Sequence, residues 1–188
     1  MSSLAETGQQ ERFFVFLDRD GTLIVEKNYL SSLDQVEFIP GSEAAVGRLN
    51  DAGAIVVLIS NQSGVGRGYF TADFVRLTHE FLQAHLQEDD GHIDAFYFCP
   101  HTPGDGCDCR KPCTGMLEKA ARDFHLELRG YVIGDRESDL EAGQRAGLKS
   151  ILVRTGYGEK IFQKGGFVAD FVASDLREAV DWILRQKT

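Results

Sequence analysis

Short apolar runs that end abruptly in polar residues recur along the chain. Residues 13–17 (FFVFL) are continuously apolar and stop at Asp18, and residues 54–59 (AIVVLI) are followed by the polar run SNQSG. Runs of this length without polar alternation are typical of buried parallel strands. We predict strands at both places, and shorter ones over 95–98, 131–133 and 150–153.

Segments with helical spacing of apolar residues separate these strands. In the segment 71–87, four apolar positions fall on one helical face and Thr71 is suited to cap the first turn. The last segment has Ser174 as a plausible cap and Trp182 among its core positions. We predict helices over 42–51, 71–87, 114–124, 138–146 and 174–184.

The alternation of strand and helix predicts an α/β fold, a three-layer Rossmann-like open parallel sheet with helices on both faces. We expect a single domain over 13–188 after a disordered tail over 1–12. Only about 40 residues separate Asp18 from Ser60, which leaves no room for a large cap domain. Ligands should therefore bind in an open pocket at the carboxyl ends of the strands.

The composition of the chain argues against some classes of binding partner. The chain has 188 residues, 43% of them apolar, and a formal net charge of -9. An acidic chain of this kind is unsuited to binding nucleic acid or an anionic membrane surface through a broad basic face, and no apolar run approaches the roughly 20 residues of a membrane span. We expect a cytoplasmic monomer that acts on a small molecule.

Two carboxylates two residues apart follow the first predicted strand. Asp18 could attack phosphorus as a nucleophile, while Asp20 protonates the leaving oxygen and later activates water. Anions that meet a phosphate require a hard cation such as Mg²⁺, for which Asp135 supplies a further carboxylate. Asp139, one helical turn later, is a second-ranked candidate to hold Asp135 or a metal-bound water.

Charge on the transferring phosphoryl group also requires fixed donors. Lys111 is the expected cationic clamp, and the Ser60 hydroxyl and the main-chain N–H groups of the turn after it are expected donors. Each of these residues taken alone would be ordinary surface chemistry. However, these residues occur in a defined order along the chain, and each lies beside a predicted strand or helix. Together they therefore support a phosphate-binding site.

That order resembles the haloacid dehalogenase superfamily over about residues 13–156. The elements that carry the resemblance are DRDGT at 18–22, Ser60, Lys111 and GDRESD at 134–139. In its phosphatases the first Asp is the nucleophile, the second is the acid/base, and Mg²⁺ is the cofactor. The resemblance implies a phosphoaspartyl intermediate on Asp18 and Mg²⁺ ligands at Asp18, Asp20 and Asp135.

A second constellation predicts a separate metal site. Cys99, His101, Cys107 and Cys109 read C-x-H-x5-C-x-C within one short loop. Four such ligands fill a tetrahedral zinc site and leave no open position, so this Zn²⁺ would be structural. The alternative is a buried Cys99 with three free thiols. Cys113 is a spare thiol.

Zinc in this loop has a consequence for the phosphate pocket. Arg110 and Lys111 follow Cys109 directly, so a rigid loop would aim both cations at that pocket. The remaining histidines, which have no motif around them, are expected to be surface residues: His79, His85, His92 and His125.

The zinc loop followed by RKP resembles two small, cap-poor families, one that acts on heptose bisphosphates and one that acts on histidinol phosphate. SNQSGVGRGYFT at 60–71, GM at 115–116 and LVRTG at 152–156 favour the heptose family, which implies a role in heptose supply for surface polysaccharide. The short x5 spacing favours the histidinol family. The resemblance implies substrate contacts from Arg19, Glu26, Lys27, Asn28, Tyr29, Asn61, Gln62, Ser63, Arg110 and Arg136.

One alternative from another class is an inactive, zinc-stabilised module that only binds sugar phosphates. The intact set of Asp18, Asp20, Lys111 and Asp135 argues against it. Phosphate release in the presence of Mg²⁺ separates the two hypotheses, since a binding module would hydrolyse nothing.

Overall fold

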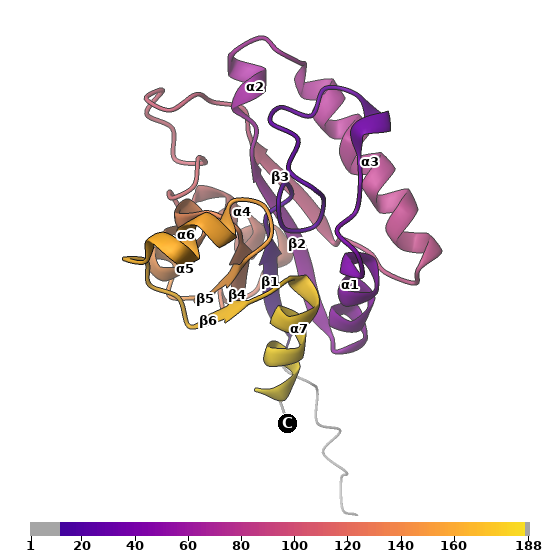
Figure 1. Ribbon diagram of the computed structural model, residues 1–188, viewed down its shortest axis with the longest axis vertical. Helices are drawn as coiled ribbons and strands as arrows, with labels where there is room; N and C mark the ends of the chain where they lie inside the picture. The colour runs from indigo at the N-terminus through magenta and orange to yellow at the C-terminus, as the bar shows by residue number, and fades with distance from the viewer. Residues whose placement is uncertain (1–11, 187–188) are drawn as a thin grey trace, which may run out of the picture.

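The computed structural model describes residues 12–186, and its centre is a six-stranded parallel sheet (Figure 1). The strand order is β3-β2-β1-β4-β5-β6, which places β1 in the middle of the sheet. The strands are β1 (Phe13–Leu17), β2 (Ala54–Asn61), β3 (Ala95–Cys99), β4 (Gly130–Gly134), β5 (Lys149–Val153) and β6 (Phe171–Ala173).

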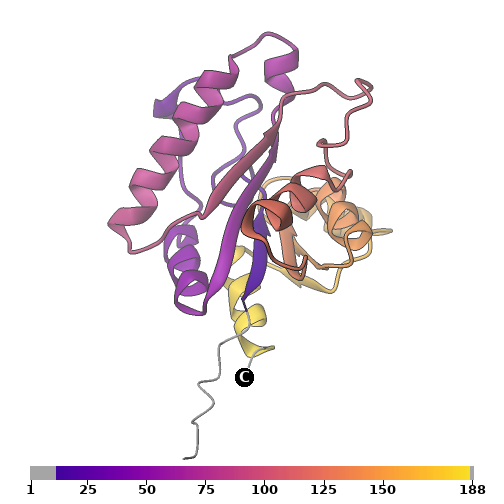
Figure 2. The same cartoon turned by 180° about the vertical axis from the view of Figure 1, so that it is seen from behind.

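Helices cover both faces of the sheet (Figures 1 and 2). Alternate residues of a strand point to opposite faces, so Val15 and Leu17 join one core cluster with α1, α3 and α7, while Phe14 and Phe16 join the other with α4 and α5. The helices are α1 (Ser42–Asp51), α2 (Ser63–Gly66), α3 (Ala72–Glu88), α4 (Gly115–Phe124), α5 (Glu137–Arg145), α6 (Gly158–Lys164) and α7 (Leu176–Arg185).

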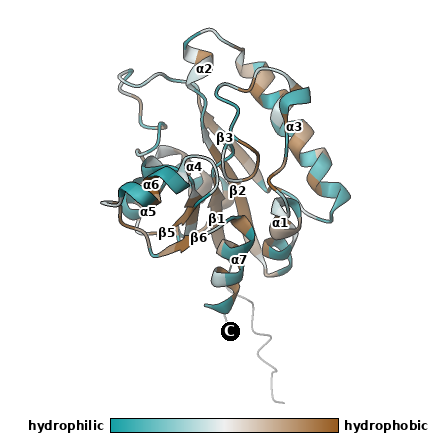
Figure 3. Cartoon of the chain, in the orientation of Figure 1, coloured by the Kyte–Doolittle hydropathy of each residue, from teal (hydrophilic) through white to brown (hydrophobic). Residues whose placement is uncertain are grey.

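The strands are the most apolar part of the fold, as Figure 3 shows, because helices bury them on both faces. This arrangement confirms the predicted three-layer α/β sheet. No helix within residues 12–186 is long and apolar enough to cross a bilayer. The chain between β1 and α1 contains a 3-10 turn (Leu33–Gln35) and two isolated β-bridges but no further helix or strand, in agreement with the expectation of no large cap.

Several local expectations need correction. The helix predicted over 174–184 is α7, but its cap is Asp175, whose side chain accepts a hydrogen bond from the main-chain N–H of Glu178. His79 is buried rather than on the surface. Its ring stacks on Phe96 at 4.8 Å between centroids, and burial lowers its pKa to about 3, which keeps the imidazole neutral. The predicted tail lies outside the described residues except for Arg12.

Candidate active site

Asp18 lies at the carboxyl end of the central strand, where the sheet topology brings the ends of β1, β2 and β4 together. Its main-chain N–H donates to the carbonyl of Ile133 at 2.9 Å, which continues the pairing of β1 with β4 to the first residue after the strand. The side chain is buried and lines a cavity of about 370 Å³. The sheet thus fixes this carboxylate at the wall of a pocket.

Lys111 contacts Asp18 directly. Its Nζ lies 2.6 Å from Asp18 Oδ1 and 2.7 Å from Asp139 Oδ1, and it donates to the carbonyl of Ile59 at 3.0 Å. Burial alone would lower the pKa of Lys111, but the two carboxylates outweigh it and raise that pKa above its usual value. Lys111 is therefore a buried, fixed cation in the wall of the pocket.

Asn61, at the end of β2, fixes the main chain of Lys111. Its Nδ2 donates to the carbonyl of Lys111 at 3.0 Å, and its Oδ1 accepts from the N–H of Lys111 at 3.0 Å. This two-bond clamp joins positions 50 residues apart in the chain. Asn61, which was expected to contact substrate, lines the cavity, and its side-chain amide positions Lys111.

The Asp20 carboxylate faces the same cavity and is held in place from two sides. Arg19 donates to both of its oxygens at 3.0 Å, and Gln62 Nε2 donates to Oδ2 at 2.9 Å. The same Gln62 nitrogen donates to the Ser60 hydroxyl oxygen at 2.5 Å. Arg19 and Gln62, which were expected to contact substrate, both line the cavity and orient Asp20 and Ser60 within it.

Asp18 belongs to a cluster of three acidic side chains. The carboxylates of Asp18, Asp135 and Asp139 offer oxygen atoms within 4.8 Å of one another. Oδ2 of Asp135 accepts from the N–H of Tyr157 at 2.7 Å, whereas its buried Oδ1 has no hydrogen-bond partner. The nearest cation to this oxygen among the described residues, Arg136 Nε, lies 4.0 Å away. A buried carboxylate oxygen without a hydrogen bond is costly unless a cation binds it closely, so the cluster fits a Mg²⁺ site.

The structure groups two of the three expected Mg²⁺ ligands, Asp18 and Asp135, with Asp139, which was ranked second. The side chain of Asp20, the third expected ligand, is held by Arg19 and Gln62. The Asp135 carboxylate packs against the main chain of two glycines, where a larger residue would not fit. A Cβ at Gly21 or at Gly156 would lie 2.1 Å from Asp135 Oδ2, and both glycines have positive φ.

When no cation is bound, the surroundings of this cluster favour the protonated form of its carboxyl groups. Burial raises the pKa of Asp18 to about 7; Lys111 opposes the rise, and Asp139 and Asp20 add to it. Burial likewise raises the pKa of Asp135 to about 8, with Asp18 and Asp139 contributing. Both groups bind more protons in the folded chain than in the unfolded one.

We therefore expect the Mg²⁺-free protein to lose stability as pH rises from about 4 to about 8, because raised pKa values favour folding only while the groups stay protonated. Bound Mg²⁺ replaces those protons, so 1 mM Mg²⁺ should raise the Tm more at about pH 8.5 than at about pH 6. Scanning calorimetry measures this difference, and Asp135→Asn should remove it. Equal shifts at the two pH values would contradict it.

The cavity contains nearly all of the predicted substrate-contact residues. Lys27 is the exception, because its Nζ pairs with Glu37 at 2.7 Å and it does not line the cavity. The predicted residues that do line it are Asp18, Arg19, Asp20, Glu26, Asn28, Tyr29, Ser60, Asn61, Gln62, Ser63, Arg110, Lys111 and Arg136.

One rim of the cavity is built by Arg136 and Tyr157. Arg136 pairs with Glu26 at 2.9 Å, and its guanidinium carbon lies 4.0 Å from the centroid of the Tyr157 ring. The Tyr157 hydroxyl donates to Asn28 Oδ1 at 2.7 Å. This network ties the segment after β1 to the segment after β5.

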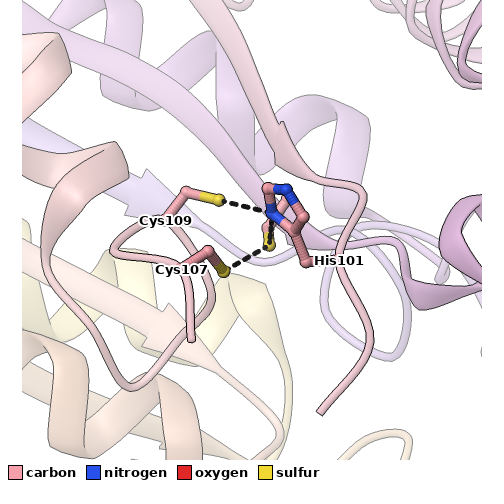
Figure 4. A group of neighbouring side chains, drawn as sticks. His101, Cys107 and Cys109 are labelled. Atoms are coloured by element: carbon pink, nitrogen blue, oxygen red, sulfur yellow. Dashed lines mark hydrogen bonds between the residues drawn. The ribbon is translucent and has the colours of Figure 1, made fainter. Parts of the chain in front are cut away.

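The cysteine and histidine side chains converge as a tetrahedral zinc site requires (Figure 4). Cys99 Sγ lies 3.6 Å from Cys107 Sγ and 3.5 Å from His101 Nδ1, which lies 3.3 Å from Cys109 Sγ. Usual Zn–S and Zn–N bond lengths in a tetrahedron give ligand separations of roughly 3.5 to 3.8 Å, so the set fits Zn²⁺. Cys113 is not in this cluster.

Sequence reasoning gave no role to Tyr157 or Arg67, which both line the cavity. Arg67 falls in the segment 60–71 that carries the family resemblance. Asp139 was ranked second, and it pairs directly with Lys111. The spacing of four residues from Asp135 was the available signal for Asp139, whereas Tyr157 reaches the site only because β5 lies beside β4.

Known proteins resemble this chain along most of its length. D-glycero-beta-D-manno-heptose-1,7-bisphosphate 7-phosphatase of Haemophilus ducreyi is 40% identical over 178 residues, which cover 90% of this chain and 97% of that protein. The chain belongs to this family. D-glycero-D-manno-heptose-1,7-bisphosphate 7-phosphatase of Thermosynechococcus vestitus is 42% identical over 184 residues, covering 90% and 94% of the two chains.

A solved member of the heptose bisphosphate phosphatase family has the same fold. The crystal structure of D,D-heptose 1,7-bisphosphate phosphatase from B. bronchiseptica, complexed with magnesium and phosphate, matches with a TM-score of 0.87 and 37% identity, covering 93% of this chain and 99% of that one. A family model described as HAD-hyrolase-like matches residues 108–179. The predicted superfamily is confirmed, and these relatives favour the heptose family over the histidinol family.

Proposed function

We propose that this chain removes the 7-phosphate of D-glycero-D-manno-heptose 1,7-bisphosphate through a phosphoaspartyl intermediate on Asp18. One observation carries the mechanism: the Asp18 carboxylate is buried at the wall of the cavity with the Lys111 ammonium 2.6 Å away. The names of the relatives support the substrate. Zinc, in this proposal, shapes the pocket and takes no part in the chemistry.

The first half-reaction transfers the phosphoryl group to the enzyme. An Asp18 oxygen forms a bond to phosphorus while the bond from phosphorus to the sugar oxygen breaks. Asp20 donates its proton to that leaving oxygen, and the sugar departs as an alcohol. Hydrogen bonds from Arg19 and Gln62 hold the Asp20 carboxyl group at the cavity, where it can make this transfer.

The second half-reaction returns the enzyme to its starting state. Asp20, now a carboxylate, removes a proton from a water molecule as that water attacks phosphorus. The bond between phosphorus and the Asp18 oxygen breaks, which releases inorganic phosphate and regenerates both carboxyl groups.

Asp18, Asp135 and Asp139 would hold Mg²⁺, since each offers an oxygen within 4.8 Å of the others and the buried Asp135 Oδ1 accepts no hydrogen bond. If Asp20 is a ligand, its main-chain oxygen would serve, because its carboxylate is already held. When bound, Mg²⁺ neutralises charge on the carboxylates and the phosphate. Lys111 and the Ser60 hydroxyl stabilise the remaining charge on the phosphoryl oxygens.

Zn²⁺ at Cys99, His101, Cys107 and Cys109 would have a structural role. The four donors fill a tetrahedron, so no position is left for substrate or water. Thiolate ligands of this kind persist in a reducing compartment, which places the enzyme in the cytoplasm in our proposal.

Steady-state kinetics in Mg²⁺ test the substrate directly. We expect kcat/KM for the heptose bisphosphate, assayed as both anomers, to exceed that for histidinol phosphate by at least about 100-fold, because only a sugar bisphosphate uses cationic groups at both ends of the cavity. A preference for histidinol phosphate would overturn the proposed substrate. Absence of phosphate release from every phosphorylated small molecule would favour the binding module instead.

A further inference from the structure

Three of the four proposed zinc ligands are thiols, and two of these lie close enough to join. Cys99 Sγ is 3.6 Å from Cys107 Sγ, so the two sulfur atoms would need to approach by about 1.5 Å to reach the roughly 2.05 Å of a disulfide. Cys107 and Cys109 have only Asp108 between them, and a disulfide across so short a segment is strained. Cys99 and Cys107 are therefore the pair best placed for a disulfide.

The two thiols differ in their access to solvent. Cys99 is fully buried at the end of β3, whereas Cys107 is only partly buried on the loop that follows. Figure 4 shows the side chains of His101, Cys107 and Cys109 pointing toward one another within this loop. Thiolates that ligate a metal are nucleophiles, and their oxidation follows their exposure. A dissolved oxidant would therefore meet Cys107 first, with Cys99 beside it as the second thiol.

Cys99 is joined to the segment that positions the catalytic groups. Its register partner on β2 is Asn61, and its carbonyl accepts from the N–H of Gln62 at 2.8 Å. Asn61 clamps the main chain of Lys111, and Gln62 holds the Asp20 carboxylate. A movement of Cys99 would therefore disturb the groups that orient Lys111 and Asp20.

Cys107 is joined to the same lysine along the chain. Three residues separate it from Lys111, and one of them, Arg110, donates to the carbonyl of His101 at 3.1 Å. Lys111 Nζ lies 2.6 Å from Asp18 Oδ1. Because an error of about 1 Å in such a contact is enough to lower a rate about 100-fold, a disulfide that pulls on this loop would affect the chemistry.

We propose that Cys99 and Cys107 form a redox-sensitive modification site, whose oxidation by a peroxide releases zinc and displaces Lys111. The loss of activity that follows rests on the proposed function, whereas the disulfide and the release of zinc do not. The enzyme would be active only while its zinc cluster stays reduced, which agrees with the reducing compartment in which we place it.

The electrons balance with hydrogen peroxide as the oxidant. The Cys107 thiolate attacks one peroxide oxygen, the O–O bond breaks, and the sulfur becomes a sulfenic acid as hydroxide leaves. The Cys99 thiolate then attacks that sulfur, the S–O bond breaks, and a second hydroxide leaves. Two protons convert both hydroxides to water, and each thiolate has lost one electron. His101 and Cys109 alone are too few ligands for tight zinc binding, so the ion is released.

The test treats the zinc-loaded protein with hydrogen peroxide in stoichiometric steps. Released zinc is measured with a chelating dye, thiols and disulfides are located by alkylation and peptide mass spectrometry, and phosphate release is assayed in Mg²⁺. We expect one zinc released per disulfide between Cys99 and Cys107, and a fall in kcat/KM of at least about tenfold. Dithiothreitol with added Zn²⁺ should restore the zinc content and the activity.

Cys113→Ser is the matched control, because Cys113 is a partly buried thiol outside the metal cluster. It should respond to peroxide as the wild type does. Oxidation confined to Cys113, a disulfide between Cys107 and Cys109, or a disulfide formed with zinc retained would overturn the inference. Release of zinc with kcat/KM unchanged, or a chain that binds no zinc, would overturn it too.

Hydrogen exchange separates this inference from the proposed function. If the reduced protein hydrolyses no phosphorylated substrate, the proposed function fails, and exchange of residues 108–112 replaces the kinetic readout. Faster exchange after peroxide, reversed by dithiothreitol with Zn²⁺, supports the displacement of Lys111, and unchanged exchange overturns it.

Discussion

Replacing Asp18 with asparagine is expected to lower kcat for phosphate release by at least about 10⁴-fold, the kind of loss that removal of a nucleophile causes in other hydrolases. The amide keeps the size of the side chain but cannot form the acyl phosphate. Lys111 and the acidic cluster stay in place around it, so substrate binding should persist. The measurement is phosphate release at saturating substrate and Mg²⁺.

The same variant should remain folded. In the Mg²⁺-free protein, Asp18 is a buried carboxyl group beside Asp135 and Asp139, and its removal relieves repulsion among the three. We expect a Tm in the absence of Mg²⁺ equal to or above that of the wild type, with a smaller increase on adding Mg²⁺. Asp51→Asn, an exposed aspartate at the end of α1, is the matched control and should retain full activity.

Loss of the zinc ligand set should have the second largest effect. Cys109→Ser is expected to abolish binding of the zinc ion that we propose at this site and to lower kcat/KM on the order of 100-fold, because displacement of a catalytic group by about 1 Å is enough for such a loss. The cause is proximity in the chain: Arg110 and Lys111 follow Cys109 directly, and Lys111 must meet Asp18 at 2.6 Å. Metal analysis and kinetics measure the two parts of this prediction.

Cys113→Ser supplies the control, since Cys113 lies four residues further on and outside the metal cluster. It should keep both zinc and activity. Hydrogen exchange of residues 100–112 should quicken in Cys109→Ser and not in Cys113→Ser. A Cys109→Ser protein that loses zinc yet keeps its kcat/KM would show that the loop holds its shape without the metal.

The parts of the fold that could be predicted are those set by local pattern. The run at 13–17 is apolar at every position because the central strand is buried on both faces, and the polar residue after it, Asp18, marks the edge of the sheet where ligands bind. The cluster of Cys99, His101, Cys107 and Cys109 could be predicted for a similar reason, because all four fall within 11 residues of one loop. Thr71 caps α3 as expected, through a hydrogen bond from the N–H of Phe74.

The parts that could not be predicted depend on contacts between distant segments. Asn61 binds the main chain of a residue 50 positions away, and Tyr157 contacts Asp135 and Asn28 across different strands. His79 is buried because Phe96 on a neighbouring strand packs against it, which its own surroundings in the sequence do not reveal. The strand β6 has only three residues, too few for a pattern to emerge.

The role of Arg19 shows the same limit. The motif around it predicts a contact with substrate and does not reveal that its guanidinium, which lines the cavity, also holds the Asp20 carboxylate. A motif identifies which residues belong to a site, but the side chains around them determine which residue meets substrate and which positions a neighbour.

Covalent trapping tests the central claim most directly. The protein is mixed with the heptose bisphosphate and Mg²⁺, quenched in acid within one turnover, and its peptides are analysed by mass spectrometry. A phosphoryl group on Asp18 in the wild type, absent from Asp18→Asn, is the predicted result. Rapid phosphate release with Asp18 unmodified, or full activity in Asp18→Asn, would contradict it.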